Sequence, residues 1–519
     1  MKKTINEHVY DVSIIGAGMG GLASANLLQR GNEKVIIFES HYYPGGCAGY
    51  FKRREGYFDV GATTLSGIKE NRPLGKLIKD LKIDLQIHQE DIGIRSYYKD
   101  KEFNYYACPD KLIEEIKDNF NYDATHFIYK IISIEKKLWK ALDSFPNFPL
   151  PSLGDLLSLL KIAPSLIASS DIFYKSFYEY LPKELKENKD FITYIDQMLL
   201  ISTQLKSKDC PAFIGIIGFL YPTDTYSSEN GMYGVCQKLA DNLKENGGIL
   251  KLKEEVLNIK KTDHYYDVTT NKGHYKTKRI IFNTPPSVTQ SILSTSDKKY
   301  YKKKNQDKGH IWGAMTAYFS FKILSALDTR YHQVILDEKD REIFKTSSLF
   351  YSFSHENDDG VTRVTVSTHI EKDGFTTKDQ EIFKTSSLFY SFSHENDDGV
   401  TRVTVSTHIE KDGFSSKDQD YYKRKEDFKK LVIACFDKYI KVEITDFKFD
   451  SVSTPLTWHH YTKRPHGEVG GLRHRNALSL LRLIPNKTNQ EIFNVGDYSF
   501  PGQGIVSVVQ GAYNIKTIL

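Results

Sequence analysis

Residues 10–40 read YDVSIIGAGMGGLASANLLQRGNEKVIIFES, and this stretch decides the fold. A short apolar run predicts a buried strand, and a glycine-rich turn follows it at once. A helix is then predicted over about residues 19–30 and a second strand over residues 34–38. The glycines of the turn have the GxGxxG spacing and are Gly16, Gly18 and Gly21. Together these elements predict the first βαβ unit of a Rossmann-like parallel sheet.

Each glycine has a physical role in such a turn. Gly16 permits the tight turn, Gly18 lets the backbone approach a pyrophosphate, and Gly21 lets the helix pack closely on the strand. The N-terminus of the helix offers free N–H groups and a positive dipole end to phosphates. Glu39 stands 23 residues after Gly16, within reach of a ribose diol. We therefore predict a dinucleotide site; the alternative is a glycine-rich turn in an ordinary βαβ unit.

The next segment, residues 41–67, reads HYYPGGCAGYFKRREGYFDVGATTLSG. Gly45 and Gly46 follow the acidic residue, and Asp59 and Gly61 form an Asp-x-Gly turn. In this context the chain resembles the flavoprotein family of phytoene desaturases, carotenoid isomerases and retinol saturases. The resemblance implies FAD rather than NAD, with the Gly-Gly pair continuing the cofactor site and the Asp-x-Gly turn leading toward the flavin. For Asp59 and Gly61 the alternative is a plain β-turn.

The C-terminal segment NVGDYSFPGQGIVSVVQGAYNIKTIL, residues 494–519, resembles the closing flavin motif of the same family. A helix starting near Gly504 would present backbone N–H groups to the pyrimidine edge of a flavin. The resemblance implies that Asp497 bonds to the ribityl or pyrophosphate region. The glycines assigned to this part of the cofactor site are Gly496, Gly502 and Gly504.

A middle segment supplies a third part of the cofactor site. A helix is predicted over residues 233–246, followed by a strand through Val256, which the family places near the adenine. Asn230 stands where the family has a glycine, and Asn tolerates the left-handed conformation that such a turn needs. Residues 279–286, RIIFNTPP, predict a buried strand that returns to the same sheet.

The predicted fold is α/β and has two parts. A three-layer FAD-binding domain with a parallel sheet comprises residues 1–75, 228–290 and 454–519. An inserted substrate domain of antiparallel sheet plus helices comprises residues 76–227 and 291–453.

Composition narrows the function classes. The chain has 519 residues, and its net charge of +5 over that length gives no argument for nucleic-acid binding. The basic run at residues 297–308 is read as a solvated face, and the alternative is contact with anionic lipid headgroups. The five scattered cysteines show no metal-ligand spacing and predict buried thiols in a reducing, cytoplasmic setting. No apolar stretch of a signal peptide precedes the first strand.

The predicted substrate domain is rich in apolar segments. Residues 145–180 carry leucines at helical spacing, which fit a core helix or an apolar mouth that dips into a bilayer. Residues 212–221 are too short to span a bilayer and would line a tunnel or pack in the core. His459 and His460 are acid or base candidates on a predicted strand, where at most one would face the flavin. Two structural or exposed histidines are the favoured alternative.

No catalytic residue is assigned from the sequence, and no metal site is expected. The chain lacks a second GxGxxG unit, so no separate nicotinamide domain is predicted. The resemblance implies an FAD-dependent desaturase or isomerase of a long polyene, peripheral on a membrane. The alternatives are a retinol-saturase-like C=C reductase and a non-catalytic lipid-binding flavoprotein. The oligomeric state stays open.

A tandem repeat interrupts the predicted substrate domain. Residues 342–380 and 381–419 are the same 39-residue unit and differ only at positions 376/415 and 377/416, where Thr is replaced by Ser. Each copy has the pattern of a β-hairpin. Two units do not make a solenoid, which needs at least three. We interpret the repeat as a recent duplication or an assembly artefact. We expect one hairpin in the substrate sheet and the other at its edge or outside it.

Overall fold

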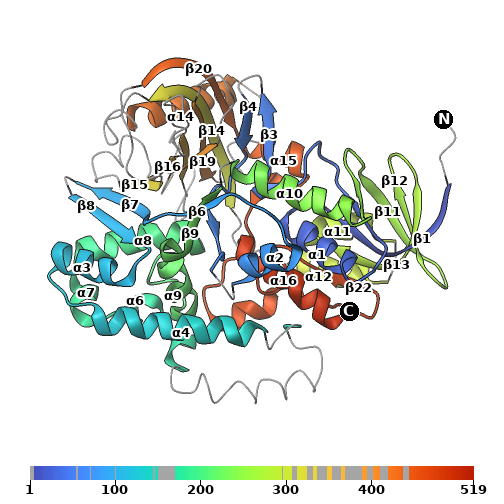
Figure 1. Ribbon diagram of the computed structural model, residues 1–519, viewed down its shortest axis with the longest axis horizontal. Helices are drawn as coiled ribbons and strands as arrows, with labels where there is room; N and C mark the ends of the chain where they lie inside the picture. The colour runs from blue at the N-terminus through green and yellow to red at the C-terminus, as the bar shows by residue number, and fades with distance from the viewer. Residues whose placement is uncertain are drawn as a thin grey trace.

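The computed structural model describes most of the chain. The described residues are 5–53, 56–69, 72–99, 101–143, 147–149, 170–228, 230–294, 296–306, 312–323, 331–335, 348–353, 364–368, 388–393, 401–409, 419–435 and 444–519. Two large sheets and a lobe of helices make up this part of the molecule (Figure 1).

The first sheet has seven strands among the described residues and contains the glycine-rich turn. Its parallel strands are β10 (Ile249–Lys251), β2 (Val35–Phe38), β1 (Ile5–Ile15), β13 (His274–Phe282) and β22 (Ile492–Asn494). Its antiparallel strands are β12 (Tyr266–Thr270) and β11 (Val256–Lys261). The first half of β13 pairs with β12 and the second half with β22. The antiparallel meander β11–β12–β13 therefore uses the same edge of β13 as the parallel strand β22.

Helices cover both faces of this sheet and give three layers. One face carries α1 (Met19–Gln29), α2 (Pro73–Leu81), α10 (Gly231–Glu245) and α16 (Ile505–Ile518). The other face carries the meander, α11 (Pro286–Ile292) and α12 (Lys298–Gln306). Successive side chains enter opposite layers: Ile14 is buried in the first core and Ile15 in the second. The helix and the strands that the first motif predicts are all present.

The second sheet has ten strands in the described part of the chain and is mostly antiparallel. Its main path runs β20, β14, β19, β17, β16, β15, β7, β8, with β18 and β21 beside this path. The bounds are β7 (Ile92–Tyr98), β8 (Lys101–Tyr106), β14 (Trp312–Ile323), β15 (Tyr331–Ile335), β16 (Ser348–Phe353), β17 (Val364–Thr368), β18 (Leu388–Ser393), β19 (Thr401–Ile409), β20 (Ile444–Ser453) and β21 (Glu468–Val469).

A lobe of helices lies below this sheet in Figure 1. Its helices are α3 (Pro109–Phe120), α4 (Thr125–Asp143), α6 (Phe177–Tyr180), α7 (Lys183–Glu187), α8 (Lys189–Thr203) and α9 (Ala212–Leu220). They share one apolar core with side chains of β7 and β8, and Ile216 and Phe219 of α9 are fully buried in it. The predicted apolar run at residues 212–221 therefore packs in the core, and Ile217, Leu220 and Tyr221 of the same run also border a cavity. The leucines predicted for the apolar mouth, 153–160, lie outside the described residues.

Shorter elements complete the chain. The strands are β3 (Tyr50–Arg53), β4 (Gly56–Asp59), β5 (Leu65–Ser66), β6 (Ile87–Gln89) and β9 (Thr225–Ser228). The α-helices are α14 (Gln419–Cys435) and α15 (Pro455–Thr462). The 3₁₀ helices are η1 (Gly46–Ala48), η2 (Ser170–Phe173), η3 (Tyr221–Asp224), η6 (Pro465–Gly467) and η7 (Ala477–Arg482).

Both copies of the repeat enter the ten-stranded sheet. The first copy forms the hairpin β16–β17 and the second forms β18–β19, with the same register: Tyr351 faces Val366, and Tyr390 faces Val405. The copies also pair with each other in parallel through equivalent positions, such as Val366 with Val405. The expectation that one hairpin lies at the edge of the sheet or outside it is therefore wrong, because strands of both copies pair inside the sheet. Identical strands offer each other matching edges, which the sequence reasoning did not consider.

Two helices that the sequence assigns wholly or partly to the substrate domain, close to its predicted limits at residues 75 and 290, pack on the seven-stranded sheet. Leu77 and Leu81 of α2 belong to the core of that sheet, and Tyr301 of α12 is buried on its other face. The domain limits at residues 75 and 290 stay predictions. In the described part of the chain, none of the helices is long and apolar enough to cross a membrane.

Candidate functional site

A cavity of about 1240 Å³ opens where the parallel strands of the first sheet end. Its wall includes the residues that directly follow three of those strands: Gly16 after β1, Glu39 after β2 and Asn283 after β13. Ligands of open α/β sheets bind at this carboxyl edge. The volume exceeds the roughly 300–1,000 Å³ typical of a pocket for one drug-sized ligand. The cavity therefore has room for a dinucleotide and a second molecule.

The three glycines of the first motif are packed so closely that larger residues would not fit. A Cβ on Gly16 would lie 2.9 Å from the Asn283 carbonyl oxygen, and Gly16 has a φ of +99°. A Cβ on Gly21 would lie 2.2 Å from the Gly16 carbonyl oxygen. Gly16 and Gly18 line the cavity, whereas Gly21 lies behind them at the contact of helix and strand. This division of roles is the one that the spacing predicts.

Glu39 is held beside the glycine turn. Its carboxylate accepts hydrogen bonds from the backbone N–H of Ala17 at 2.9 Å and of His41 at 2.8 Å. Its own N–H donates to the carbonyl of Lys251 on the neighbouring strand β10. Glu39 therefore presents a fixed carboxylate to the cavity, at the position where the sequence predicts a ribose contact.

The Gly-Gly pair closes over the first turn. Gly45 and Gly46 have φ values of +117° and +61°, and Gly45 forms a bridge with Gly18. Beside them Cys47 lines the cavity, where burial raises the pKa of its thiol. A raised pKa keeps the thiol protonated and unreactive. The expectation of buried thiols does not extend to Cys108, which is exposed.

Asp59 differs from its predicted place. It is 1% exposed, does not line the cavity, and accepts a hydrogen bond from the Met232 N–H at 3.0 Å. Burial raises the pKa of Asp59 well above its usual range. The carboxyl therefore caps the N-terminus of α10, and a Cβ on Gly231 would lie 2.8 Å from it. Val60 and Gly61 of this turn line the cavity, and Gly61 packs on Trp458.

Asn283 joins the two halves of the site and was missed from the sequence. Its side-chain N–H donates to the Gly16 carbonyl at 3.1 Å. Its side-chain oxygen would meet a Cβ on Gly496 at 2.8 Å. An Asn directly after a predicted buried strand, in the sequence Asn-Thr-Pro-Pro, was the available signal. The N- and C-terminal motifs thus meet around one amide.

The C-terminal motif adds a second helix end to the cavity. Gly504, with a φ of +95°, precedes α16, and no atom lies within 4 Å of the Cβ position. The helices α1 and α16 pack side by side (Figure 1), and both begin at the cavity wall. Two positive dipole ends therefore face one space. Gly502 does not line the cavity; its Cβ position lies 3.5 Å from His474.

Asp497 lines the cavity but is paired with a buried arginine. Arg464 Nη2 lies 2.8 Å from Asp497 Oδ2. The same guanidinium donates to the carbonyls of Glu468 and Gly470. Because β21 pairs with β14, Arg464 ties the loop of the first sheet to the second sheet. Val256, the residue predicted near the adenine, also lines the cavity and is 7% exposed.

His459 and His460 do not line the cavity. They lie on the helix α15 rather than on the predicted strand, and both are exposed. His459 Nδ1 lies 2.8 Å from the carbonyl oxygen of Arg464, so it has a structural contact. The favoured alternative for the two histidines agrees with this position.

The far wall of the cavity comes from the helical lobe and mixes apolar with polar side chains. Ile217 and Leu220 of α9 and Trp139 of α4 are its apolar part. Glu135 accepts a hydrogen bond from the Trp139 indole at 3.0 Å and forms an ion pair with Arg72. Gln204, at the end of α8, is 6% exposed. Among the described residues its side-chain oxygen has no hydrogen-bond partner.

These residues fit FAD. Glycines without space for a Cβ let the backbone approach a pyrophosphate, and two helix N-termini favour its charge. A carboxylate is fixed beside the turn, and the cavity continues past these glycines to the mixed wall of the helical lobe, where α9 contributes apolar side chains. We call Gly16, Gly18, Gly45, Gly46 and Gly496 the glycine cradle.

The model of the family "Flavin containing amine oxidoreductase" matches residues 19–384. The chain belongs to this family of flavoprotein oxidoreductases, and its cofactor is FAD.

Three curated relatives are similar at low identity. A chloroplastic prolycopene isomerase of Arabidopsis thaliana is 22% identical over 98% of this chain and 82% of its own length. A 4,4'-diapophytoene desaturase of Methylomonas sp. is 25% identical over 47% of each chain. A human all-trans-retinol 13,14-reductase is 27% identical over 31% of this chain and 28% of its own.

Two solved structures share the fold. An oxidoreductase from Methanosarcina mazei has a TM-score of 0.57 at 14% identity, covering 97% of this chain and 99% of its own. A putrescine oxidase double mutant has a TM-score of 0.56 at 12% identity, covering 98% of both chains. These neighbours support a mixed-sheet FAD fold for this chain.

Proposed function

We propose that the protein is an FAD-dependent isomerase or desaturase of a long polyene lipid. The curated relatives that act on prolycopene and diapophytoene support this substrate class. The observation that carries the proposal is the continuity of one cavity from the glycine cradle to the apolar wall of α9. A long apolar chain would bury its surface against such a wall, whereas a small polar amine would gain little from it.

The proposed division of labour follows the two sheets. The seven-stranded sheet with its helices is the FAD-binding domain, and the ten-stranded sheet with the helical lobe is the substrate domain. Glu39 bonds to the ribose, the glycine cradle admits the pyrophosphate, and Val256 lies at the adenine. Asp497, fixed by Arg464, bonds to the ribityl region. Asp59 acts indirectly, by positioning α10.

FAD, when bound, supplies redox chemistry at its isoalloxazine ring. The residues of the chain orient the substrate and exclude water from the cavity. Ile217 and Leu220 exclude water from the wall opposite the cradle. Trp139 is held by its hydrogen bond to Glu135, so its ring has a fixed orientation for packing on a polyene.

The proposal is tested by expression in a host that makes phytoene or lycopene isomers, with chromatography of the pigments. We expect new isomers or desaturated products in the presence of the intact chain. Ile217→Glu should abolish them while FAD stays bound, because it places a charge on the apolar wall. Ile214→Glu is the matched control: it lies on the same helix, away from the cavity lining. Unchanged pigments with a flavin-loaded protein would overturn the substrate class.

A second candidate is reduction of a C=C bond in a polyene that carries a polar end. The unpartnered oxygen of Gln204 favours it, because a buried acceptor loses free energy unless a ligand donates to it. The similarity to a retinol reductase supports this candidate. Its test is incubation with a polyene alcohol and an external two-electron donor, followed by mass spectrometry. A saturated product that Gln204→Leu reduces is expected; an unreduced alcohol would exclude this candidate.

A further inference from the structure

A surface outside the cavity combines exposed positive charge with exposed leucines. It consists of α12 and η7 and is called the basic leucine surface. Its charged members on α12 are Lys298, Lys299, Lys302 and Lys303, and all four are exposed. On the neighbouring η7, Leu478 and Leu481 are 73% and 52% exposed. Arg475, just before η7, is also exposed.

The outward direction of these lysines follows from how α12 is seated. Tyr301 is fully buried and donates to the Asn494 side chain at 2.6 Å. Lys304 donates to the carbonyls at the end of η7, including Leu483 at 2.9 Å. At 100° per residue, these two inward positions leave Lys299, Lys302 and Lys303 on the opposite side, while Lys298 lies at the edge of the anchored face in the first turn. The helix therefore has one anchored face and one basic face.

The leucines protrude for a similar reason. A 3₁₀ helix has three residues per turn, so positions three apart lie on one side. Ala477 and Leu480 pack against the core of the helical lobe. Leu478 and Leu481 therefore share the solvent side, next to the end of α12 that Lys304 fixes.

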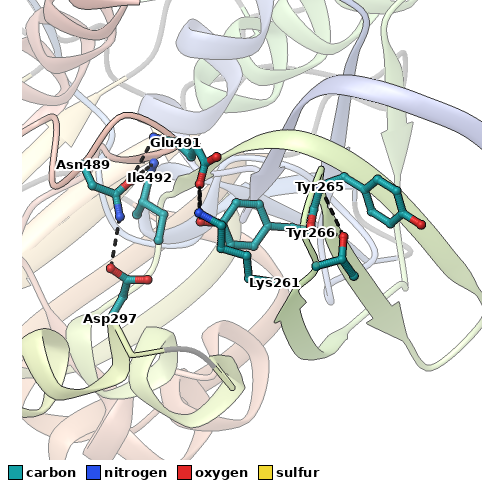
Figure 2. A network of polar contacts seen from close by, with 8 residues as sticks. Lys261, Tyr265, Tyr266, Asp297, Asn489, Glu491 and Ile492 are labelled. Carbon is teal, nitrogen blue, oxygen red and sulfur yellow. Dashed lines mark hydrogen bonds and ion pairs between the residues drawn. The ribbon is translucent and has the colours of Figure 1, made fainter.

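A network of polar contacts holds the start of α12 to the sheet, as Figure 2 shows. Asp297 accepts a hydrogen bond from Asn489 at 3.0 Å, so its charge is turned inward. The Asn489 side-chain oxygen accepts from the N–H groups of Glu491 and Ile492, each at 2.8 Å. Glu491 in turn forms an ion pair with Lys261. The basic leucine surface is therefore a rigid platform on the seven-stranded sheet.

We propose that the basic leucine surface docks on a lipid bilayer that carries anionic headgroups. Lysines attract a negative surface potential, and exposed leucines gain free energy by entering the acyl boundary. Charge complementarity identifies the partner as anionic lipid, and the leucines favour a bilayer over a nucleic acid, which offers no apolar phase. The inference does not depend on the substrate class proposed above.

The experiment is flotation of the FAD-loaded full chain with two kinds of vesicle. One kind is pure phosphatidylcholine, and the other contains three parts phosphatidylcholine to one part phosphatidylserine. Flotation with the anionic vesicles, weakened by added salt, is expected. Conversion of the four lysines of α12 to Glu should weaken binding by more than about a hundredfold. Leu478→Ser with Leu481→Ser should weaken binding by about tenfold at every salt concentration.

A control variant carries the same change in net charge on elements away from α12 and η7: Lys82→Glu, Lys117→Glu, Lys189→Glu and Lys238→Glu, all at exposed lysines. It should float nearly as well as the intact chain. Flavin absorbance and thermal unfolding check that each variant is folded. Equal losses in both four-residue variants would overturn the proposal, because the effect would then be one of net charge. Absence of flotation with the intact chain, or binding to a DNA duplex but to neither vesicle, would also overturn it.

Discussion

In the glycine cradle each residue fits one place, whereas in the ten-stranded sheet four strands come from two copies of one unit. Gly16 and Gly46 are surrounded by different atoms, so an added side chain would meet a different close neighbour at each position. The strands β17 and β19 have equivalent residues in equivalent hairpins and differ only in what flanks them. Close packing therefore restricts each position of the cradle to glycine. In the sheet, by contrast, the same repeated sequence occupies two different places. Four predictions test this difference, from the largest expected effect to the smallest.

Gly21→Val should abolish FAD binding. A Cβ at this position would lie 2.2 Å from a backbone oxygen, so α1 must move away from β1. We expect FAD affinity to fall by more than about a hundredfold, measured by flavin fluorescence during titration of the apoprotein. The control is Gly273→Ala, where the nearest atom lies at 3.5 Å and affinity should not change. A Gly21→Val protein that retains FAD would show that the contact of α1 with β1 behind the cradle tolerates a larger side chain.

Arg464→Gln should cost about 3 kcal/mol of unfolding free energy, because it removes a buried guanidinium and leaves the partly buried Asp497 without its partner. This arginine is the joint between the cradle and the ten-stranded sheet. Urea unfolding with flavin fluorescence and circular dichroism should show the two sheets losing cooperativity. Arg279→Gln breaks the more exposed pair with Glu33 and should cost about 1 kcal/mol or less. Equal costs for the two variants would contradict a special role for Arg464.

Acid should loosen the C-terminal side of the cradle through His474. Burial lowers the pKa of His474 from 6.5 to about 4, and its Nε2 has no hydrogen-bond partner among the described residues. The unfolded chain takes up this proton below 6.5, and the folded chain does so only near 4. Stability should therefore fall by about 3 kcal/mol as the pH drops through this window, and not change further below it.

The measurement for His474 is the unfolding free energy of the intact chain and of His474→Gln between pH 7 and pH 4. The difference between the two curves isolates the histidine from the other titrating groups. We expect the variant to have the flatter curve. Parallel curves would mean that the histidine is not the group that responds.

Deletion of residues 381–419 should have the smallest effect. The first hairpin already pairs with β15 through β16, and its β17 has the sequence with which β19 pairs with β14. One hairpin therefore suffices to connect β14 to β15. We expect full FAD occupancy and a thermal midpoint equal to or above that of the intact chain. Deletion of residues 342–380 gives a chain that differs at two positions and should behave identically. Loss of folding in either deletion would mean that both copies are structural.

The sequence was sufficient wherever backbone geometry restricts the residue type. The GxGxxG spacing predicted β1, α1 and β2, because only glycine fits those contacts. The closing motif predicted the start of α16 near Gly504, where the restriction is the φ of +95° rather than a close contact. Residues whose importance depends on distant partners were not accessible. Asn283 contacts Gly16 and the Gly496 loop, which are hundreds of residues apart in the chain, so its place at the end of a predicted strand did not reveal these contacts.

Two errors have a common cause. Asp59 was assigned to the cofactor site because the family resemblance implies an Asp-x-Gly turn that leads toward the flavin, but its side chain is buried at the N-terminus of α10. His459 and His460 were placed on a strand, but Pro455 starts a helix that turns both to the solvent. In each case the residue type indicated a polar role. The direction in which the side chain points could not be predicted, because it depends on the packing of other elements. The strand pairing between the two repeats likewise followed from tertiary partners.

The contact between α1 and α16 has a consequence for biosynthesis. The helix that starts one wall of the cavity leaves the ribosome hundreds of residues before the helix that starts the other wall. Gly496 and Gly504 reach the cavity only after the described strands of both sheets have been translated. A nascent chain therefore has an incomplete cradle until α16 has been synthesised, and we expect stable flavin loading to follow the synthesis of that helix. A transcript truncated before α16 would yield a polypeptide that holds the first motif and retains no cofactor.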